Sequence, residues 1–169
     1  LQSLDTHPPA VMVPLAFKGG TTMIGVLITT HGNLGNELIH AAESIKGKLK
    51  DVMHVCVEQT KGVEDLKKEI QNAIKKLDKG KGVLILTDLF GGTPSNISLS
   101  FMKEGKVEVV TGVNLPMLLK LSDVKEETTL NEFATFIKEY GKKNISLASE
   151  ILSKKLSGDQ LAESYDIAL

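Results

Sequence analysis

The chain has 169 residues, of which 41% are hydrophobic and 24% are charged, a length that suits one domain with one core. Its 20 basic and 21 acidic residues give a formal net charge of −1, which argues against nucleic acid or an anionic membrane surface as partners. No apolar stretch approaches the roughly 20 residues of a membrane-spanning helix, so we expect no direct membrane insertion. The single cysteine, Cys56, excludes an internal disulfide framework and fits a reducing cytoplasm, and its apolar neighbours favour a buried structural thiol.

The first 22 residues differ in composition from the rest of the chain. They hold three of the five prolines and a Gly19-Gly20 pair, and they show neither a helical nor a strand period. We interpret residues 1–22 as an N-terminal extension of the kind that a cloning vector can add. The domain proper is expected over 23–152, and residues 153–169 are expected to form a C-terminal tail or linker.

From residue 23 onward, strands and helices are predicted to alternate. The apolar, β-branched run 24–29 predicts a strand, and Asn33 is the expected N-cap of a helix over 34–46. A second strand is expected at 52–57. A helix over 63–77 follows, because its apolar residues recur at 3.6 spacing with lysines opposite.

The next strand and helix frame a glycine turn. The run 82–87 is continuously apolar, as in a strand buried on both faces. Pro94 suits the first position of a helix that is capped by Thr93 and runs to about Met102. A fourth strand is expected at 107–111.

The last part of the domain is predicted to be mostly helical. Helices are expected over 117–122 and 130–140, the second ended by Gly141. The brief alternation at 144–147 indicates a short edge strand, with a helical start as the open alternative. The whole pattern predicts an α/β fold with three layers, in which helices cover both faces of an open, mostly parallel sheet.

Two candidate reacting groups follow predicted strands directly. His31 follows the first strand and Asp88 follows the third, and the carboxyl ends of parallel strands are where ligands and reactions lie. A neutral imidazole is a good nucleophile toward phosphorus, and a carboxylate on its Nδ1–H fixes the tautomer. The turn at 91–93 and the helix start after it supply amide donors for phosphoryl oxygens. We therefore predict that His31 and Asp88 meet and that His31 carries a covalent group.

Each of these features also has a structural interpretation. A histidine after a strand can be merely solvated, and an aspartate before glycines often forms only a turn or a cap. Asn114 and Pro116 can likewise form a simple turn. His40 and His54 are interpreted as structural. No second histidine, cysteine or carboxylate has metal-ligand spacing to His31, so we expect no metal.

Three motifs together resemble the enzyme IIA component of the mannose-family (mannose, fructose and sorbose) phosphoenolpyruvate-dependent sugar phosphotransferase system. They are the segments 30–32, 86–96 and 112–118, which read THG, LTDLFGGTPSN and GVNLPML. The resemblance implies strand order 2-1-3-4, with an antiparallel fifth edge strand near Ile145 and Leu147 that protomers of a homodimer can exchange. It implies the following site: His31 phosphorylated on Nε2, Asp88 orienting its ring, Gly32, Gly92 and Thr93 around the phosphoryl group, and Asn114 and Pro116 bordering it.

The resemblance also implies an activity. The chain would be a cytoplasmic phosphotransferase without cofactor, which accepts a phosphoryl group from the phosphocarrier protein HPr and passes it to a IIB component for sugar uptake. A IIA-like subunit of a dihydroxyacetone kinase and a regulatory IIA-like domain of a transcriptional activator are the alternatives. A ligand-binding module, in which His31 only hydrogen-bonds a small anion, is a further one. The sugar itself does not follow from the sequence, since IIA does not contact it.

Overall fold

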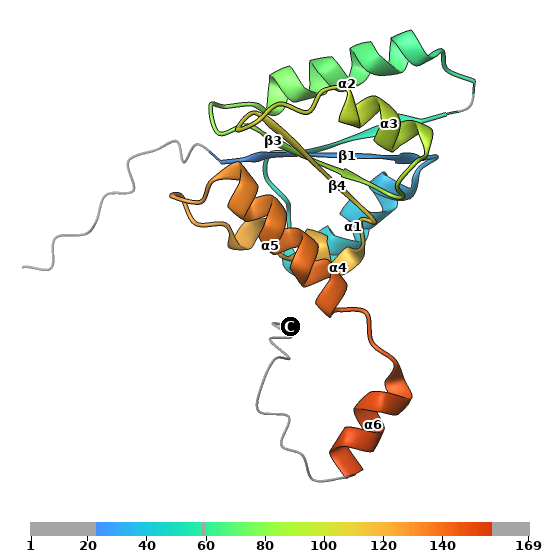
Figure 1. The fold of residues 1–169 in the computed structure, drawn as a ribbon, viewed down its shortest axis with the longest axis vertical. Coiled ribbons are helices and arrows are strands. Elements are labelled where there is room, and N and C mark those ends of the chain that lie inside the picture. The colour runs from blue at the N-terminus through green and yellow to red at the C-terminus, as the bar shows by residue number, and fades with distance from the viewer. Residues whose placement is uncertain (1–22, 59, 157–169) are drawn as a thin grey trace, which may run out of the picture.

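A sheet of four parallel strands forms the centre of the molecule (Figure 1). The computed structural model describes residues 23–58 and 60–156, so the predicted extension over 1–22 and most of the predicted tail lie outside the described residues. The strands follow the order β2-β1-β3-β4, as predicted. Their bounds are β1 Gly25–His31, β2 Val52–Val57, β3 Val83–Thr87 and β4 Val107–Thr111.

Helices cover both faces of this sheet, which confirms the predicted three layers (Figure 1). Helices α2 and α3 lie on one face, and α1, α4 and α5 lie on the other. Their bounds are α1 Leu34–Lys46, α2 Val63–Leu77, α3 Thr93–Leu99, α4 Leu115–Leu119, a 3-10 turn Leu121–Asp123, α5 Leu130–Lys143 and α6 Ala148–Leu156. Among the described helices, none is long and apolar enough to cross a membrane.

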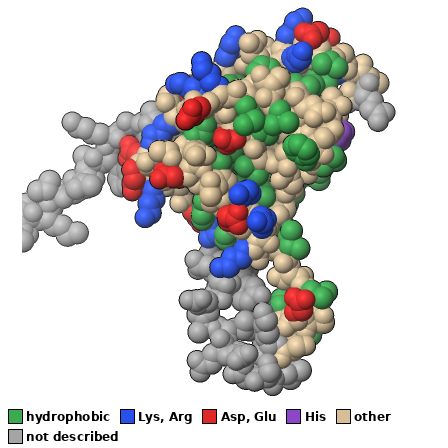
Figure 2. All heavy atoms as spheres, viewed as in Figure 1, with side chains coloured by type: hydrophobic (Ala, Val, Ile, Leu, Met, Phe, Trp, Pro, Cys, Tyr) green, Lys and Arg blue, Asp and Glu red, His purple; other side chains and the backbone are tan. Residues whose placement is uncertain are grey.

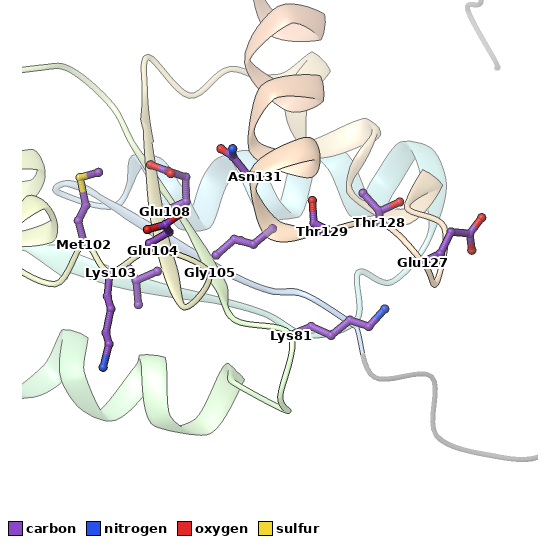
Figure 3. Close-up of a pocket in the computed structure, with 12 residues that line it drawn as sticks. Lys81, Met102, Lys103, Glu104, Gly105, Glu108, Glu127, Thr128, Thr129 and Asn131 are labelled. Atoms are coloured by element: carbon purple, nitrogen blue, oxygen red, sulfur yellow. The ribbon is translucent and has the colours of Figure 1, made fainter.

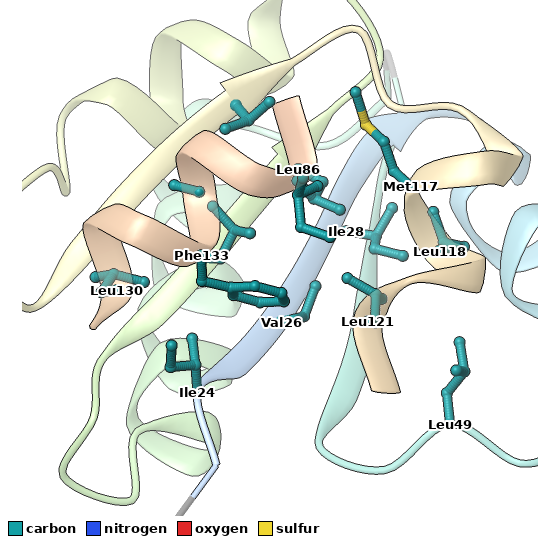
Figure 4. Packing of buried hydrophobic residues seen from close by; sticks show 14 of the residues in the cluster. Ile24, Val26, Ile28, Leu49, Leu86, Met117, Leu118, Leu121, Leu130 and Phe133 are labelled. Atoms are coloured by element: carbon teal, nitrogen blue, oxygen red, sulfur yellow. The ribbon is translucent and has the colours of Figure 1, made fainter. Parts of the chain in front are cut away.

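The strand side chains alternate between two cores, as a period of two requires. Val26 and Ile28 of β1 point to the α4 and α5 side, where Phe133 of α5 is buried with them (Figure 4). Leu27 and Ile85 belong to the other core, under α2 and α3. Because β1 and β3 are buried on both faces, their positions in the molecule are set by packing from two sides.

The adjacency of β1 and β3 positions the candidate site. They pair in parallel, with Ile28 beside Leu86 and Thr29 beside Thr87. The chain therefore leaves both strands at the same end of the sheet. The neighbours of β1 are β2 on one side and β3 on the other, which makes this end a topological switch point.

The strand edge at β4 carries a local hydrogen bond. Glu108 of β4 accepts a hydrogen bond through Oε1 from the backbone N–H of Val109, at 2.9 Å. Among the described residues, β3 is the only strand that pairs with β4, and the other side of β4 forms a single antiparallel bridge, between Val107 and Lys103. Beyond Val107, that side of β4 is an open edge of the sheet.

One predicted helix start was wrong, and another was confirmed in position but lacks the capping hydrogen bond. Helix α3 begins at Thr93 with Gly92 in the N-cap position, so Thr93 is not the cap, and α3 ends at Leu99 rather than near Met102. Asn33 does occupy the N-cap position of α1, but its side chain donates to Glu37 Oε1 at 2.6 Å instead of capping the first turn.

The predicted end of α5 at Gly141 was also wrong. The helix continues to Lys143, so Gly141 lies inside it. At Gly141, α5 packs closely against Met117 of α4. A Cβ atom at Gly141 would lie 2.2 Å from Cε and 2.7 Å from Cγ of the buried Met117. The glycine is needed for close approach of α4 to α5, not for a turn.

The predicted fifth strand is not formed. After the last turn of α5, residues 145–147 have no regular structure, and α6 follows. Ile145 donates its backbone N–H to Lys142 O at 3.3 Å, and both Ile145 and Leu147 are exposed. The alternation at 144–147 therefore belongs to the connection between two helices.

Candidate functional site

His31 is the last residue of β1 and lies at the carboxyl end of the sheet. Its side chain is 45% exposed, although the two preceding threonines are fully buried. The backbone then turns at Gly32, whose N–H donates to Val57 O at the end of β2 at 3.3 Å. The strand thus ends by presenting an imidazole at the surface, on a rigid support.

Asp88 follows β3 and contacts His31 through one oxygen. Its Oδ2 accepts a hydrogen bond from the His31 backbone N–H at 2.9 Å and lies 2.8 Å from His31 Nδ1. Its Oδ1 accepts from the Leu89 N–H at 2.9 Å. Since an ionised carboxylate only accepts hydrogen bonds, Nδ1 carries the ring proton and Nε2 keeps a free lone pair.

The electrostatics keep the Asp88 carboxylate ionised. Its side chain is only 10% exposed, and this burial by itself raises the pKa. Hydrogen bonds from His31 and from the Leu89 N–H outweigh the burial, and the pKa of Asp88 lies below its usual value. At neutral pH the group beside the imidazole is therefore a negatively charged acceptor.

Gly92 lies directly against the imidazole. A Cβ atom at this position would be 2.8 Å from Cε1 and 3.4 Å from Nε2 of His31. The φ of Gly92 is −80°, which any residue adopts, so the glycine is required here for space. The loop is braced by Ser95, whose Oγ accepts from the Gly91 N–H and donates to the Gly92 carbonyl.

A cavity of 280 Å³ opens beside the ring. Thr93 lines it together with His31, and the other lining residues come from the end of β2 and the start of α2: Val57, Glu58, Lys61, Val63 and Leu66. Lys61 is ion-paired with Glu69, with Nζ 3.0 Å from Oε1. The predicted residues Gly32, Gly92 and Thr93 thus all lie next to His31 in chain or in space.

The structure uses Asn114 in another way. Its Oδ1 accepts from the Met117 N–H, which caps α4, and its Nδ2 donates to the Gly141 carbonyl of α5, both at 3.2 Å. Pro116 lies in the first turn of α4. The polar atoms of Asn114 therefore join two helices instead of pointing to the imidazole. The segment just before Asn114 does reach the site, because the N–H groups of Gly112 and Val113 donate to Thr87 O, next to Asp88.

His40, His54 and a second, larger cavity do not belong to the site around His31. His40 is exposed on α1, and the half-buried His54 of β2 has its pKa lowered by burial and by His40. A larger cavity of 730 Å³ lies between the start of β4 and the first turn of α5 (Figure 3). Its lining combines lysines and glutamates with apolar and neutral polar residues, and it does not include His31. Within the described residues, no three His, Cys, Asp or Glu side chains gather in a way that could hold a metal ion.

Solved structures define the class of protein to which this fold belongs. A phosphotransferase system component EIIA from Streptococcus agalactiae superposes with a TM-score of 0.68 at 25% identity, over 76% of this chain and 99% of that one. A PTS IIA protein associated with the fucose utilization operon of Streptococcus pneumoniae gives a TM-score of 0.68 at 26% identity, over 77% and 96%. The fold is thus that of a IIA protein of the sugar phosphotransferase system.

The sequence comparison assigns the family. Residues 25–138 match the EIIA-man family, described as PTS system fructose IIA component, and the chain belongs to this family. The fructose-specific EIIA component of Bacillus subtilis is 30% identical over 139 residues, which cover 82% of this chain and 95% of that protein. The mannose-specific EIIAB component of Escherichia coli K12 is 30% identical over 124 residues, 72% of this chain but 38% of that longer protein.

These relationships establish a general role. The chain is a phosphotransfer carrier of a sugar phosphotransferase system, as the resemblance of its three motifs indicated. A sigma-54 interaction domain protein from Enterococcus faecalis is similar with a TM-score of 0.57 at 16% identity, a likeness of fold alone. The alternatives, a dihydroxyacetone kinase subunit and a regulatory domain of a transcriptional activator, are therefore not favoured.

Proposed function

We propose that Nε2 of His31 accepts a phosphoryl group from phosphorylated HPr and passes it to a IIB component. The observation that carries this proposal is the Asp88 carboxylate, which is bound at once to the His31 backbone N–H and to its ring Nδ1. This arrangement favours the tautomer whose Nε2 lone pair faces outward. It also holds the ring in one orientation while the reaction proceeds.

The transfer is a displacement at phosphorus. The Nε2 lone pair attacks, and the bond between phosphorus and the donor's imidazole nitrogen breaks. The electron pair of that bond stays on the donor ring, whose other nitrogen carries a proton, so the donor leaves as a neutral imidazole. The His31 ring becomes positively charged as its Nε2–P bond forms, and the adjacent carboxylate of Asp88 stabilises that charge. In the second step, a nucleophile on IIB displaces His31 in the same way.

The residues around the ring are proposed to hold the phosphoryl oxygens. Gly92 leaves space beside Nε2, Gly32 follows His31 directly in the chain, and Thr93 can donate its hydroxyl hydrogen from the neighbouring cavity. Asn114 and Pro116 are proposed to border the site through the backbone, since they hold the loop that hydrogen-bonds the end of β3.

We further infer the setting in which the domain works. The IIA domain would span 23–152, act in the cytoplasm as a homodimer, and need no cofactor, metal or nucleic acid. The exposed Ile145 and Leu147, beyond α5, support an assembly that covers them. Light scattering of the purified chain tests the dimer, and a monomer at micromolar concentration would argue against it.

Mapping of the phosphorylated residue tests the relay. The protein is incubated with enzyme I, HPr and phosphoenolpyruvate, and the expected product carries one acid-labile, alkali-stable phosphoryl group. His31→Ala should abolish the labelling, and His40→Ala, a matched change of an exposed histidine, should retain it. Labelling that persists in His31→Ala would overturn the proposed site.

A further inference from the structure

The loop between β3 and α3, residues 88–92, contacts the His31 ring at both of its ends. Asp88 begins the loop and lies 2.8 Å from Nδ1 of the ring. Gly92 ends it, and a Cβ atom there would be 2.8 Å from Cε1 and 3.4 Å from Nε2. These three ring atoms are consecutive, so one loop borders the whole edge of the imidazole that includes the attacking nitrogen.

Packing holds the middle of this loop only weakly. Leu89 is half exposed and Phe90 is 74% exposed, and Figure 2 shows hydrophobic side chains on the surface at this end of the molecule. Gly91 follows with a φ of +85°, and the pair Gly91-Gly92 has the wide conformational freedom of glycine. The position of Gly92 beside the ring therefore depends on the hydrogen bonds that hold the glycine pair.

Ser95 connects both glycines to the first turn of α3. It is fully buried, and its Oγ accepts from the Gly91 N–H at 2.9 Å and donates to the Gly92 carbonyl at 3.0 Å. Asn96 adds two bonds, from its Nδ2 to the Gly91 carbonyl at 3.2 Å and from its backbone N–H to the Gly92 carbonyl at 2.9 Å. A buried hydroxyl costs free energy unless it is hydrogen-bonded, and the hydroxyl of Ser95 bonds to the loop.

Ser98, further along α3, shows that a buried serine in this helix does not need such a contact. It is also fully buried, and its Oγ donates to the Pro94 carbonyl at 2.7 Å, within the helix. The bond from the Gly91 N–H is therefore particular to Ser95, and Ser98 offers a matched control.

We propose that Ser95 is a positioning residue for phosphoryl transfer, which acts through Gly92 on the His31 ring. Its hydroxyl fixes the glycine pair, and the glycine pair holds the Cε1 and Nε2 edge of the ring while Asp88 holds Nδ1. The Nε2 lone pair then keeps one direction, as attack on phosphorus requires. This inference rests on the proposed function, because it concerns the reaction of that same histidine.

The variants Ser95→Ala and Ser98→Ala test the inference as a matched pair. Each removes one buried hydroxyl from α3, and both are assayed well below their melting temperatures. Ser95→Ala should lower kcat for transfer from phospho-HPr about 10- to 100-fold and leave KM within about twofold, whereas Ser98→Ala should change neither. Phosphorylation of Ser95→Ala by phosphoramidate, a small donor, should slow by the same factor, because the defect lies at the ring and not in donor binding.

A nuclear Overhauser effect tests the geometry without any phosphoryl donor. The effect between His31 Hε1 and the Gly92 Hα protons is expected in the wild type and in Ser98→Ala, and it should weaken or vanish in Ser95→Ala. Asn96→Ala changes an exposed residue and keeps the test open if Ser95→Ala does not fold. It removes the bond from Nδ2 to the Gly91 carbonyl and should lower kcat about threefold or more.

Other outcomes would overturn the inference. A kcat for Ser95→Ala within about twofold of the wild type would show that the contact does not serve the reaction. An equal loss in Ser95→Ala and Ser98→Ala would assign the effect to α3 as a whole, and a raised KM with an unchanged kcat would assign it to donor binding. Failure of the proposed function is distinct, since His31 of the wild type would then accept phosphate from neither donor.

Discussion

Replacing Asp88 by Asn exchanges one carboxylate oxygen for an NH₂ group. We expect this change to move the ring proton of His31 from one nitrogen to the other. The Asp88 oxygen that faces His31 accepts from two donors, the backbone N–H and Nδ1. If the Asn amide oxygen takes the place next to the Leu89 N–H, its NH₂ group faces the His31 backbone N–H and needs an acceptor. Nδ1 then becomes that acceptor, the ring proton moves to Nε2, and the nucleophilic lone pair is lost.

The size of the effect follows from these contacts. Loss of one charge-assisted hydrogen bond costs about 1.5–3 kcal/mol, which corresponds to about 10- to 150-fold in rate. The wrong tautomer adds to this loss, since the corresponding change in a Ser-His-Asp triad lowers kcat about 10⁴-fold. We therefore expect Asp88→Asn to slow phosphoryl transfer about 10²- to 10⁴-fold.

A single-turnover experiment measures this rate. The variant is mixed with phospho-HPr in a rapid-quench instrument, and phosphorylated product is counted over time. Asp123→Asn is the matched control, because Asp123 is likewise an ion-paired carboxylate, bound to Lys46 and Lys120, but lies on the α4 side of the molecule. Transfer by Asp88→Asn within threefold of wild type, with an unchanged circular dichroism spectrum and thermal midpoint, would refute the role given to Asp88.

Three further predictions concern packing and pH. Gly92→Ala should slow transfer at least about tenfold, because the added methyl group displaces the His31 ring. Thermal stability should stay unchanged, because the backbone angles of Gly92 suit alanine. A rapid-quench time course measures the rate, and a melting curve measures the stability. The free energy of unfolding should fall as the pH drops below about 6.5, because burial lowers the pKa of His54 and the unfolded chain then binds more protons. Urea titrations at pH 7.5 and 5.5 test this, and His54→Gln should show a smaller difference between the two. Gly141→Ala should lower the free energy of unfolding, measured in urea, by about 1–3 kcal/mol, since the added methyl group overlaps Met117. The double variant Gly141→Ala with Met117→Ala should lose less stability than the sum of the losses in the two single variants.

The sequence predicts the sheet well and the helix ends poorly, for physical reasons. The runs at 24–29 and 82–87 are apolar on both faces because helices cover both, so the signal is strong. The end of α5 was predicted wrongly at Gly141, because a glycine near the end of a helical pattern is typical of a helix end. In the structure this glycine makes room for Met117, which is 24 positions away in the chain. The alternation at 144–147 was too short to distinguish a strand from a helix connection.

The candidate site shows the same division. The positions of His31 and Asp88 after two apolar strands indicate that their side chains share one end of the sheet. The sequence contains no signal that one carboxylate oxygen binds both the backbone and the ring of His31, or that Gly92 touches the ring. The signal for the cap by Asn114 was present, since an asparagine followed by proline in the first helical turn is typical of a helix start.

The side chain of Glu108 bears on how the outer strand behaves toward other polypeptides. An exposed strand offers free amides to any extended segment that approaches, and such addition leads to aggregates. Here a carboxylate already occupies the amide of Val109, so an invading segment has to displace it and place its own backbone beside a negative charge. Glu108 thus protects this edge of the sheet from strand addition. A neutral β-branched residue in its place would leave the Val109 amide free to pair with other chains.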